Sequence, residues 1–121
     1  MFVNLTASLV LAFSSFTGLL GHHHRRPHHR RHAIVAWDGP VTASWYYDGG
    51  STACGFHATY GFASLFLPCG AHITMRGPNG RPVQAVMQDH GPYIAGRTFD
   101  LNPSLKAALG CGDLCSVYYH R

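Results

Sequence analysis

Apolar and polar residues alternate through most of the chain beyond its N-terminal third, and this period of two predicts short β-strands. In residues 41–47, Val41, Ala43, Trp45 and Tyr47 alternate with polar or smaller neighbours, so we expect one buried face. The other strand-like segments are residues 60–67, 71–76, 81–88 and 116–120.

Residues typical of turns separate these segments. The sequence DGGS at 48–51 predicts a turn in which Asp48 is a local capping residue. The sequence GPNG at 77–80 joins two alternating segments and indicates a β-hairpin. One helix is predicted: Asn102 is a suitable N-cap, Pro103 occupies the first turn, and Gly110 follows the last apolar position. Several short strands with one helix favour a small closed β-barrel.

The first 33 residues do not share this pattern. Residues 1–21 are apolar without a charged side chain, which predicts a signal peptide or a membrane anchor. Residues 22–33 hold six histidines and four arginines and have no apolar periodicity. We expect this segment to be a disordered linker, and residues 34–121 to form the folded domain.

The charge of the chain is concentrated in that linker. The 121 residues carry a formal net charge of +4, and all four linker arginines contribute to it. Beyond the linker the charges cancel, so the sequence excludes a basic nucleic-acid-binding face there. The charged residues of that part are Arg76, Arg81, Arg97, Lys106 and Arg121 against Asp38, Asp48, Asp89, Asp100 and Asp113.

Four cysteines follow the export-like segment, which favours two disulfides in an oxidising compartment. Three pairings are possible, and we favour Cys54–Cys69 with Cys111–Cys115. An alternative is a zinc site, because Cys54 with His57 and Cys69 with His72 both have the spacing C-x-x-H.

Residues 86–102 (VMQDHGPYIAGRTFDLN) hold the candidate site. Two of the five aspartates, Asp89 and Asp100, flank a glycine- and proline-containing loop that also carries Arg97. Such a loop is expected to hold both carboxylates near one groove. The alternative interpretation is structural: Asp89 caps a turn and Asp100 pairs with Arg97.

The chain resembles the RlpA-like double-psi β-barrel domains, which are related to expansins and barwin. The resemblance covers residues 43–121 and rests on ASWY at 43–46, STACG at 51–55, ASLFLPCG at 63–70, NGRPV at 79–83 and DHGPYIAGRTFDL at 89–101. It implies a mainly β fold, a six-stranded double-psi barrel with one short helix. It also implies a cell-wall polysaccharide as substrate, in particular the glycan strands of peptidoglycan.

The resemblance assigns roles to several residues. Asp100 lies where the family has its key acid, and Asp89 matches an aspartate of the family's Asp-Arg-Gly-Pro segment, with His90 in place of the arginine. The implied catalytic residues are Asp100 and Asp89. The implied substrate-binding residues are Thr52, His57, His90, Tyr93, Arg97 and Trp45, and we expect Tyr93, Trp45 and Phe99 to form an apolar wall near Asp100.

Two departures from the family bear on catalysis. The family's glutamate and histidine correspond here to Phe56 and Ser64. A lytic transglycosylase needs only one acid, because the sugar's own hydroxyl is the nucleophile. Three hypotheses are therefore carried forward: a lytic transglycosylase-like enzyme of the cell envelope, a non-catalytic expansin-like binding module, and the zinc-binding domain. The first two predict a secreted or envelope-bound monomer that needs no cofactor.

Overall fold

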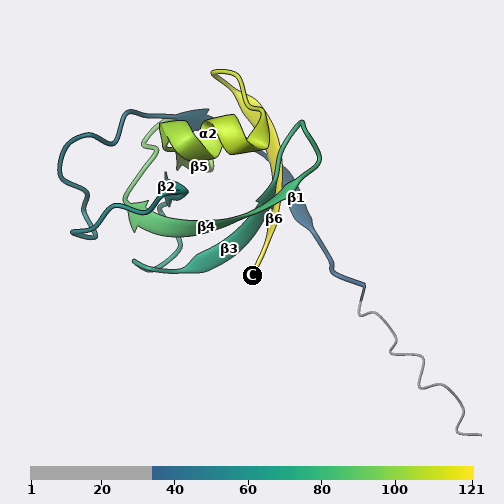
Figure 1. The fold of residues 1–121 in the computed structure, drawn as a ribbon, viewed down its shortest axis with the longest axis horizontal. Coiled ribbons are helices and arrows are strands. Elements are labelled where there is room, and N and C mark those ends of the chain that lie inside the picture. Colours follow the sequence, from purple (N-terminus) through teal and green to yellow (C-terminus); the bar gives the residue numbers. More distant parts are fainter. Residues whose placement is uncertain (1–33) are drawn as a thin grey trace, which may run out of the picture. The chain divides into compact units, whose positions relative to one another are not determined.

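The computed structural model describes residues 34–121, in which six strands and one short helix form a closed barrel (Figure 1). The elements are β1 (Asp38–Trp45), β2 (Gly61–Ala63), β3 (His72–Arg76), β4 (Pro82–Asp89), β5 (Phe99–Leu101), α2 (Pro103–Leu109) and β6 (Cys115–His120). The predicted six-stranded barrel with one short helix is confirmed.

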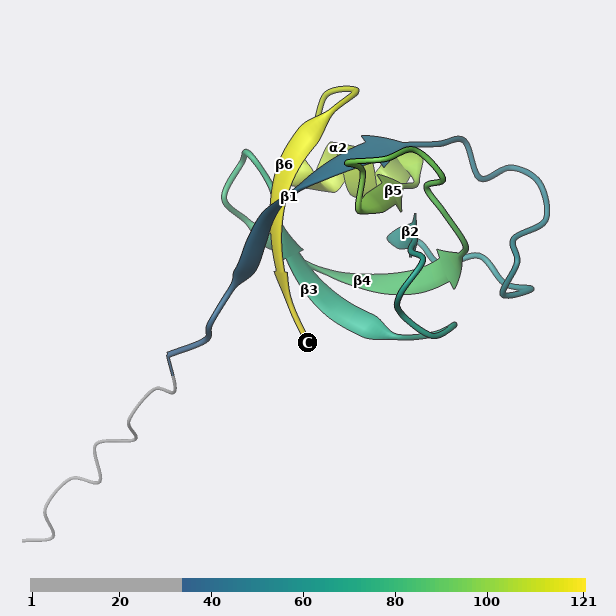
Figure 2. The same cartoon turned by 180° about the vertical axis from the view of Figure 1, so that it is seen from behind.

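The order of strands around the barrel is β1-β5-β2-β4-β3-β6, and β6 pairs again with β1. The predicted hairpin is confirmed, because β3 and β4 are antiparallel neighbours joined at Gly77–Gly80. Two pairs, β1 with β5 and β2 with β4, are parallel and join segments far apart in the sequence (Figure 2). Strand β5 was not predicted, and β2 is shorter than the apolar segment 60–67 suggested.

The barrel interior is filled by apolar side chains from every strand and from the helix. Phe62 and Phe99 pack edge to face with 5.3 Å between ring centroids, and Phe99 packs in the same way on Tyr119 at 5.1 Å. The remaining buried members are Ala43, Leu67, Ile73, Met75, Ala85, Met87, Leu101, Leu105, Leu109, Cys115 and Val117.

The predicted buried face of the first strand is only partly correct. Val41 and Ala43 pack on the core, but Trp45 and Tyr47 are exposed. The reason is that β1 ends at Trp45, so Tyr47 already belongs to the long connection to β2 and has no opposing strand to pack on.

Helix α2 begins and ends where the sequence predicted. The Asn102 side chain accepts a hydrogen bond from the Leu105 amide at 2.9 Å, and Gly110 ends the helix in the left-handed conformation. The β3–β4 hairpin contacts the C-terminal end of the helix. The backbone amide of Asn79 donates to the Leu109 carbonyl, and its side-chain amide donates to the Ala108 carbonyl. The helix is therefore tied to the barrel at both termini.

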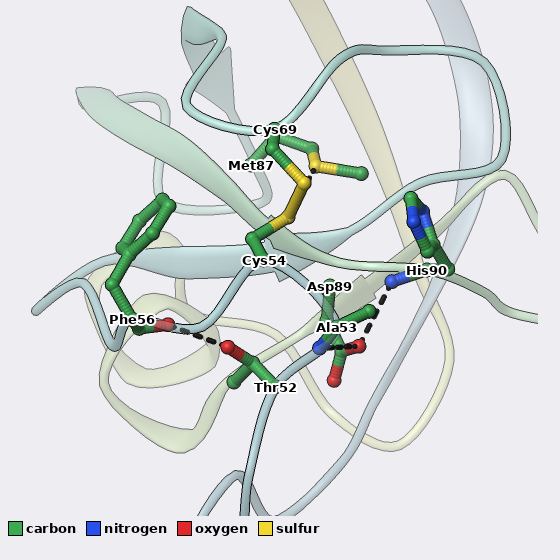
Figure 3. The surroundings of a disulfide bond; sticks show 8 residues. All are labelled: Thr52, Ala53, Cys54, Phe56, Cys69, Met87, Asp89 and His90. Atoms are coloured by element: carbon green, nitrogen blue, oxygen red, sulfur yellow. Dashed lines mark hydrogen bonds between the residues drawn. A yellow bond between two sulfur atoms is a disulfide. The ribbon is translucent and has the colours of Figure 1, made fainter.

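Both predicted disulfides are confirmed, Cys54–Cys69 and Cys111–Cys115. The first ties the β1–β2 connection to the segment between β2 and β3 (Figure 3). The zinc hypothesis is wrong, because the sulfur atoms of Cys54 and Cys69 are bonded to each other and are not thiolate ligands.

The predicted signal peptide or anchor (residues 1–21) and the predicted linker (residues 22–33) both lie outside the described residues. Across residues 34–121, no helix has the length and apolar character needed to cross a membrane.

The two disulfides should differ in their contribution to stability. Cys54 and Cys69 are 15 residues apart, whereas Cys111 and Cys115 are four apart. A longer loop loses more entropy when it is closed in the unfolded chain, so replacing the first pair by alanine should lower the free energy of unfolding by about 3 kcal/mol, and the second by about 2 kcal/mol. Urea denaturation measures both; a larger loss for the second pair would contradict this account.

Candidate functional site

The two candidate acids lie on either side of one residue, Ala63. Ser44 of β1 is in register with Asp100 of β5, Asp100 with Ala63 of β2, and Ala63 with Asp89 of β4. We call these four residues the Ala63 strip. Since neighbouring strands lie roughly 4.8 Å apart, the Cα atoms of Asp89 and Asp100 are about 10 Å apart. The strand register therefore brings the two acids into one region of the barrel, and the groove expected to hold both carboxylates stays a prediction.

Asp89 is held by backbone amides. One of its carboxylate oxygens, Oδ1, accepts hydrogen bonds from the Ala53 and His90 amides, both at 2.9 Å (Figure 3). Beside it, the hydroxyl of Thr52 donates to the Phe56 carbonyl at 2.7 Å and so fixes the turn that presents Ala53. The ring of His90 points away from the carboxylate (Figure 3).

Asp100 has a side-chain partner. The Ser44 hydroxyl donates to its Oδ1 at 2.8 Å. The loop that follows β4 comes close to the strip at Gly91, whose φ of +130° favours glycine, and a Cβ built there would lie 3.9 Å from that of Ala63. Within residues 34–121, Arg97 forms no ion pair with either acid. The interpretation in which Asp100 pairs with Arg97 is therefore wrong.

A β-bulge in β4 places Gln88 at the centre of a second set of hydrogen bonds. Phe62 pairs with Met87, but Ala63 pairs with Asp89, so Gln88 is an extra residue in the ladder. Gln88 is fully buried. Its Oε1 accepts from the Ala58 amide at 2.7 Å, and its Nε2 donates to the Tyr46 hydroxyl at 2.9 Å and to Asp48 Oδ2 at 2.8 Å.

The Gln88 amide requires Gly61 on the neighbouring strand. A Cβ built on Gly61 would overlap Gln88 Oε1, so a larger residue there would displace the amide. The bulge and the glycine thus act together to bring a buried polar side chain to this end of the barrel.

Asn102 joins the same contacts to helix α2. While its Oδ1 caps the helix, its Nδ2 donates to Asp48 Oδ2 at 3.1 Å and to the carbonyls of Ala58 and Thr59 at 3.1 and 3.2 Å. We call Gln88, Asp48, Asn102 and Tyr46 the Gln88 network. It fixes the connection from β1 to β2 on the barrel.

Asp48 is the charged member of this network. Burial alone would raise the pKa of its carboxyl, but the hydrogen bonds from Gln88 and Asn102 favour the carboxylate, and the pKa lies below its usual value. His57 Nδ1 lies 3.7 Å from Asp48 Oδ2, and its ring is half exposed. Asp48 was predicted to be only a turn residue. Its carboxylate instead accepts hydrogen bonds from Gln88 and Asn102 and so joins β4 to the start of helix α2.

The remaining predicted site residues are distributed unevenly. Tyr93 is 79% exposed and lies on the loop that passes over Ala63. Trp45 follows Ser44 in β1, so it points to the opposite face of the strand. Its indole donates to Asp113 at 3.0 Å, the Lys106 ammonium lies over its ring, and it lines a hollow of about 360 Å³ against helix α2. Phe99 is fully buried and is not part of an exposed wall.

Three members of the Gln88 network were not predicted as site residues from the sequence. They are Gln88, Tyr46 and Asn102, of which Asn102 was predicted only as a helix cap. The signal for Gln88 was a long polar residue inside an apolar strand, directly before Asp89. The signal for Asn102 was weaker, because its capping role already explained it.

The carboxylate of Asp48 should make stability depend on pH. Because its folded pKa is depressed, its contribution is present above the unfolded value of about 3.9 and is lost as the pH falls through the folded value. Asp48→Asn should therefore lower the free energy of unfolding at pH 7 by about 1–3 kcal/mol, with a smaller difference below about pH 4.

Urea denaturation at pH 7 and at about pH 2.5 tests this, with the exposed Asp38, changed to asparagine, as the matched control. A variant Asp48→Asn that equals the parent at pH 7 would show that the carboxylate contributes nothing.

Comparison with known proteins supports the fold and leaves the family open. No model of a known protein family matches the chain, and no curated protein matches its sequence. Among solved structures, the Streptomyces papain inhibitor is similar in fold, with a TM-score of 0.52 and 18% sequence identity over 69% of this chain and 94% of that one. The chain is thus a six-stranded barrel with two disulfides and a structural neighbour that inhibits papain.

Proposed function

We propose that this protein is an exported cell-wall module that binds a glycan strand across the Ala63 strip. The observation that carries the proposal is the register that aligns Asp89, Ala63 and Asp100 on three adjacent strands. Ala63 is buried beneath the loop at Gly91, but both acids are partly exposed, and their carboxylates can accept hydrogen bonds from the hydroxyl groups of a sugar.

The polar contacts of the strip suit a ligand that donates hydrogen bonds. Both carboxylates are held by uncharged donors, the Ser44 hydroxyl for Asp100 and backbone amides for Asp89. In residues 34–121 these hydrogen bonds engage Oδ1 of each acid and leave Oδ2 for a ligand. Tyr93, exposed on the adjoining loop, offers an aromatic face for a sugar ring.

The two departures from the RlpA-like pattern favour binding over cleavage. Ser64 is buried, and its hydroxyl accepts hydrogen bonds from the amides of Phe66 and Leu67. Phe56 cannot transfer a proton. Cleavage would therefore depend on Asp100 as the one acid, as a lytic transglycosylase mechanism allows, with Asp89, Thr52, His57, His90 and Arg97 as supporting groups. We therefore propose that the protein binds glycan strands. Cleavage of the bound strand, if the test below detects it, would be that of a lytic transglycosylase.

The disulfides support export. Two bridges join all four cysteines, which suits an oxidising compartment outside the cytoplasm. The apolar segment at residues 1–21 is the proposed export signal or anchor.

The decisive experiment incubates the purified protein with peptidoglycan and measures both the fraction that pellets and the new chain ends by mass spectrometry. We expect the parent to pellet, and Asp100→Asn and Asp89→Asn each to weaken the apparent affinity about tenfold, the effect of roughly 1.4 kcal/mol from a lost charge-assisted hydrogen bond. The control Asp38→Asn should equal the parent.

The chain ends distinguish binding from catalysis. Anhydro-sugar ends formed by the parent and not by Asp100→Asn would make the protein a lytic transglycosylase. A parent that neither pellets nor forms new ends would exclude the proposal.

A second candidate is inhibition of a papain-like protease, as the name of the structural neighbour states for that protein. The observation that favours it is a set of exposed apolar side chains on the loops after β2 and β4, namely Leu65, Phe66 and Ile94. These loops leave the same end of the barrel, because β2 and β4 are parallel neighbours. Exposed apolar side chains on adjacent loops are suited to docking on another protein.

Residual papain activity in the presence of the protein tests this candidate. If it is correct, the parent inhibits and Leu65→Ser weakens inhibition about tenfold, which corresponds to roughly 1.4 kcal/mol of apolar contact. The matched control is Leu114→Ser, since Leu114 is 57% exposed and Leu65 59%, and Leu114 lies between the cysteines of the second disulfide. Full papain activity at high protein concentration would exclude inhibition.

A further inference from the structure

Tyr46 connects the strands that carry the two acids, although no motif assigned it a role. Its backbone amide donates to the Leu101 carbonyl at 2.9 Å, so it continues β1 alongside β5, one residue beyond Asp100. Its hydroxyl lies 2.9 Å from Gln88 Nε2 on β4, the residue before Asp89. In the barrel, β5 and β2 lie between β1 and β4. The Tyr46 and Gln88 side chains together therefore link the end of β1 to β4.

The phenolic proton of Tyr46 is not used in a hydrogen bond within residues 34–121. The Gln88 amide nitrogen is a donor, so the Tyr46 oxygen accepts in this contact. A hydroxyl also carries one proton to donate, and no acceptor for it is found among residues 34–121. The direction of the oxygen is fixed by Gln88, which is itself held by Ala58 and Asp48.

The surroundings keep this proton on the oxygen. Burial raises the pKa of Tyr46 to about 12, and the carboxylates of Asp89, Asp48 and Asp100 add to the rise, against the Gln88 hydrogen bond, which lowers it. Asp48 is the nearest of these carboxylates by its contacts, because it accepts from the same Gln88 Nε2 as the Tyr46 hydroxyl does. Tyr46 is thus a neutral donor beside carboxylates, which can only accept.

We propose that Tyr46 is a further ligand-binding residue of the Ala63 strip, where its hydroxyl donates a hydrogen bond to an acceptor oxygen of the bound sugar. The inference rests on the proposed glycan binding and deepens it. Carboxylates recognise the protons of sugar hydroxyls but not their oxygens, and Tyr46 supplies a donor for one of these oxygens. Gln88 is the positioning residue that holds it.

The test compares two adjacent tyrosines. Tyr46→Phe and Tyr47→Phe each remove one hydroxyl, but Tyr47 is 81% exposed and its hydroxyl makes no hydrogen bond within residues 34–121. In the peptidoglycan pelleting assay we expect Tyr46→Phe to lower the apparent affinity about five- to tenfold, the range of a lost neutral hydrogen bond, and Tyr47→Phe to leave it unchanged.

A loss of stability must be separated from a loss of the donor, because Tyr46→Phe also removes an acceptor of Gln88. The affinities are therefore measured at least about 20 °C below each thermal midpoint, where the folded state is complete. The variant without Cys111 and Cys115 is the control for destabilisation alone, and it should bind as the parent does.

Two results would overturn the inference, and they differ in what they say of the proposed function. If Tyr46→Phe binds as tightly as the parent while Asp100→Asn binds weakly, Tyr46 is not a ligand-binding residue and the strip remains the site. If the parent does not bind peptidoglycan at all, the proposed function and the inference are both wrong.

Discussion

The buried amide of Gln88 is the interaction on which the end of the barrel that holds the candidate site depends. It has one acceptor and two donors, and all three are used, by Ala58, Tyr46 and Asp48. A buried amide that loses a partner is left with an unsatisfied polar group, which costs about 1–3 kcal/mol. The long connection between β1 and β2 has no regular secondary structure of its own. It is held in place by the hydrogen bonds of Gln88, and moving it would leave the buried amide without its partners.

This interaction links the core to the candidate site. The bulge that places Gln88 in the ladder also shifts the register so that Asp89, and not Gln88, lies opposite Ala63. Without the extra residue, the alternation of β4 would put a different side chain beside the strip. Asn102 makes a similar connection, since one amide caps α2 and holds the β1–β2 connection. Fold and site thus share residues.

Most of the architecture could be predicted from the sequence because its causes are local. Alternation placed four of the strands, GPNG placed the hairpin, and Asn102, Pro103 and Gly110 placed the helix. Strand β5 has only three residues, too few to show a period, and it forms because Phe99 and Leu101 find a place in the core. The disulfide pairing followed from a weak preference that the structure confirms.

The site was only partly predictable, because it depends on register between distant strands. The sequence indicated Asp89 and Asp100 but could not show that both align with Ala63. It gave Asp48 a turn role, since aspartate beside glycine is common in turns, whereas the partners of its carboxylate are 40 and 54 residues away. It also grouped Trp45 with the acids, although alternation in β1 turns Trp45 to the other face.

The parallel pairing of β1 with β5 has a consequence for the order in which the molecule is made. Ser44 and Asp100 are 56 residues apart, and the strand between them in the chain that completes the strip, β2, pairs with β5 as well. A chain that is still being synthesised and has not reached β5 has neither a closed barrel nor an assembled strip. The Ala63 strip therefore exists only once the whole domain has been made and the barrel has closed.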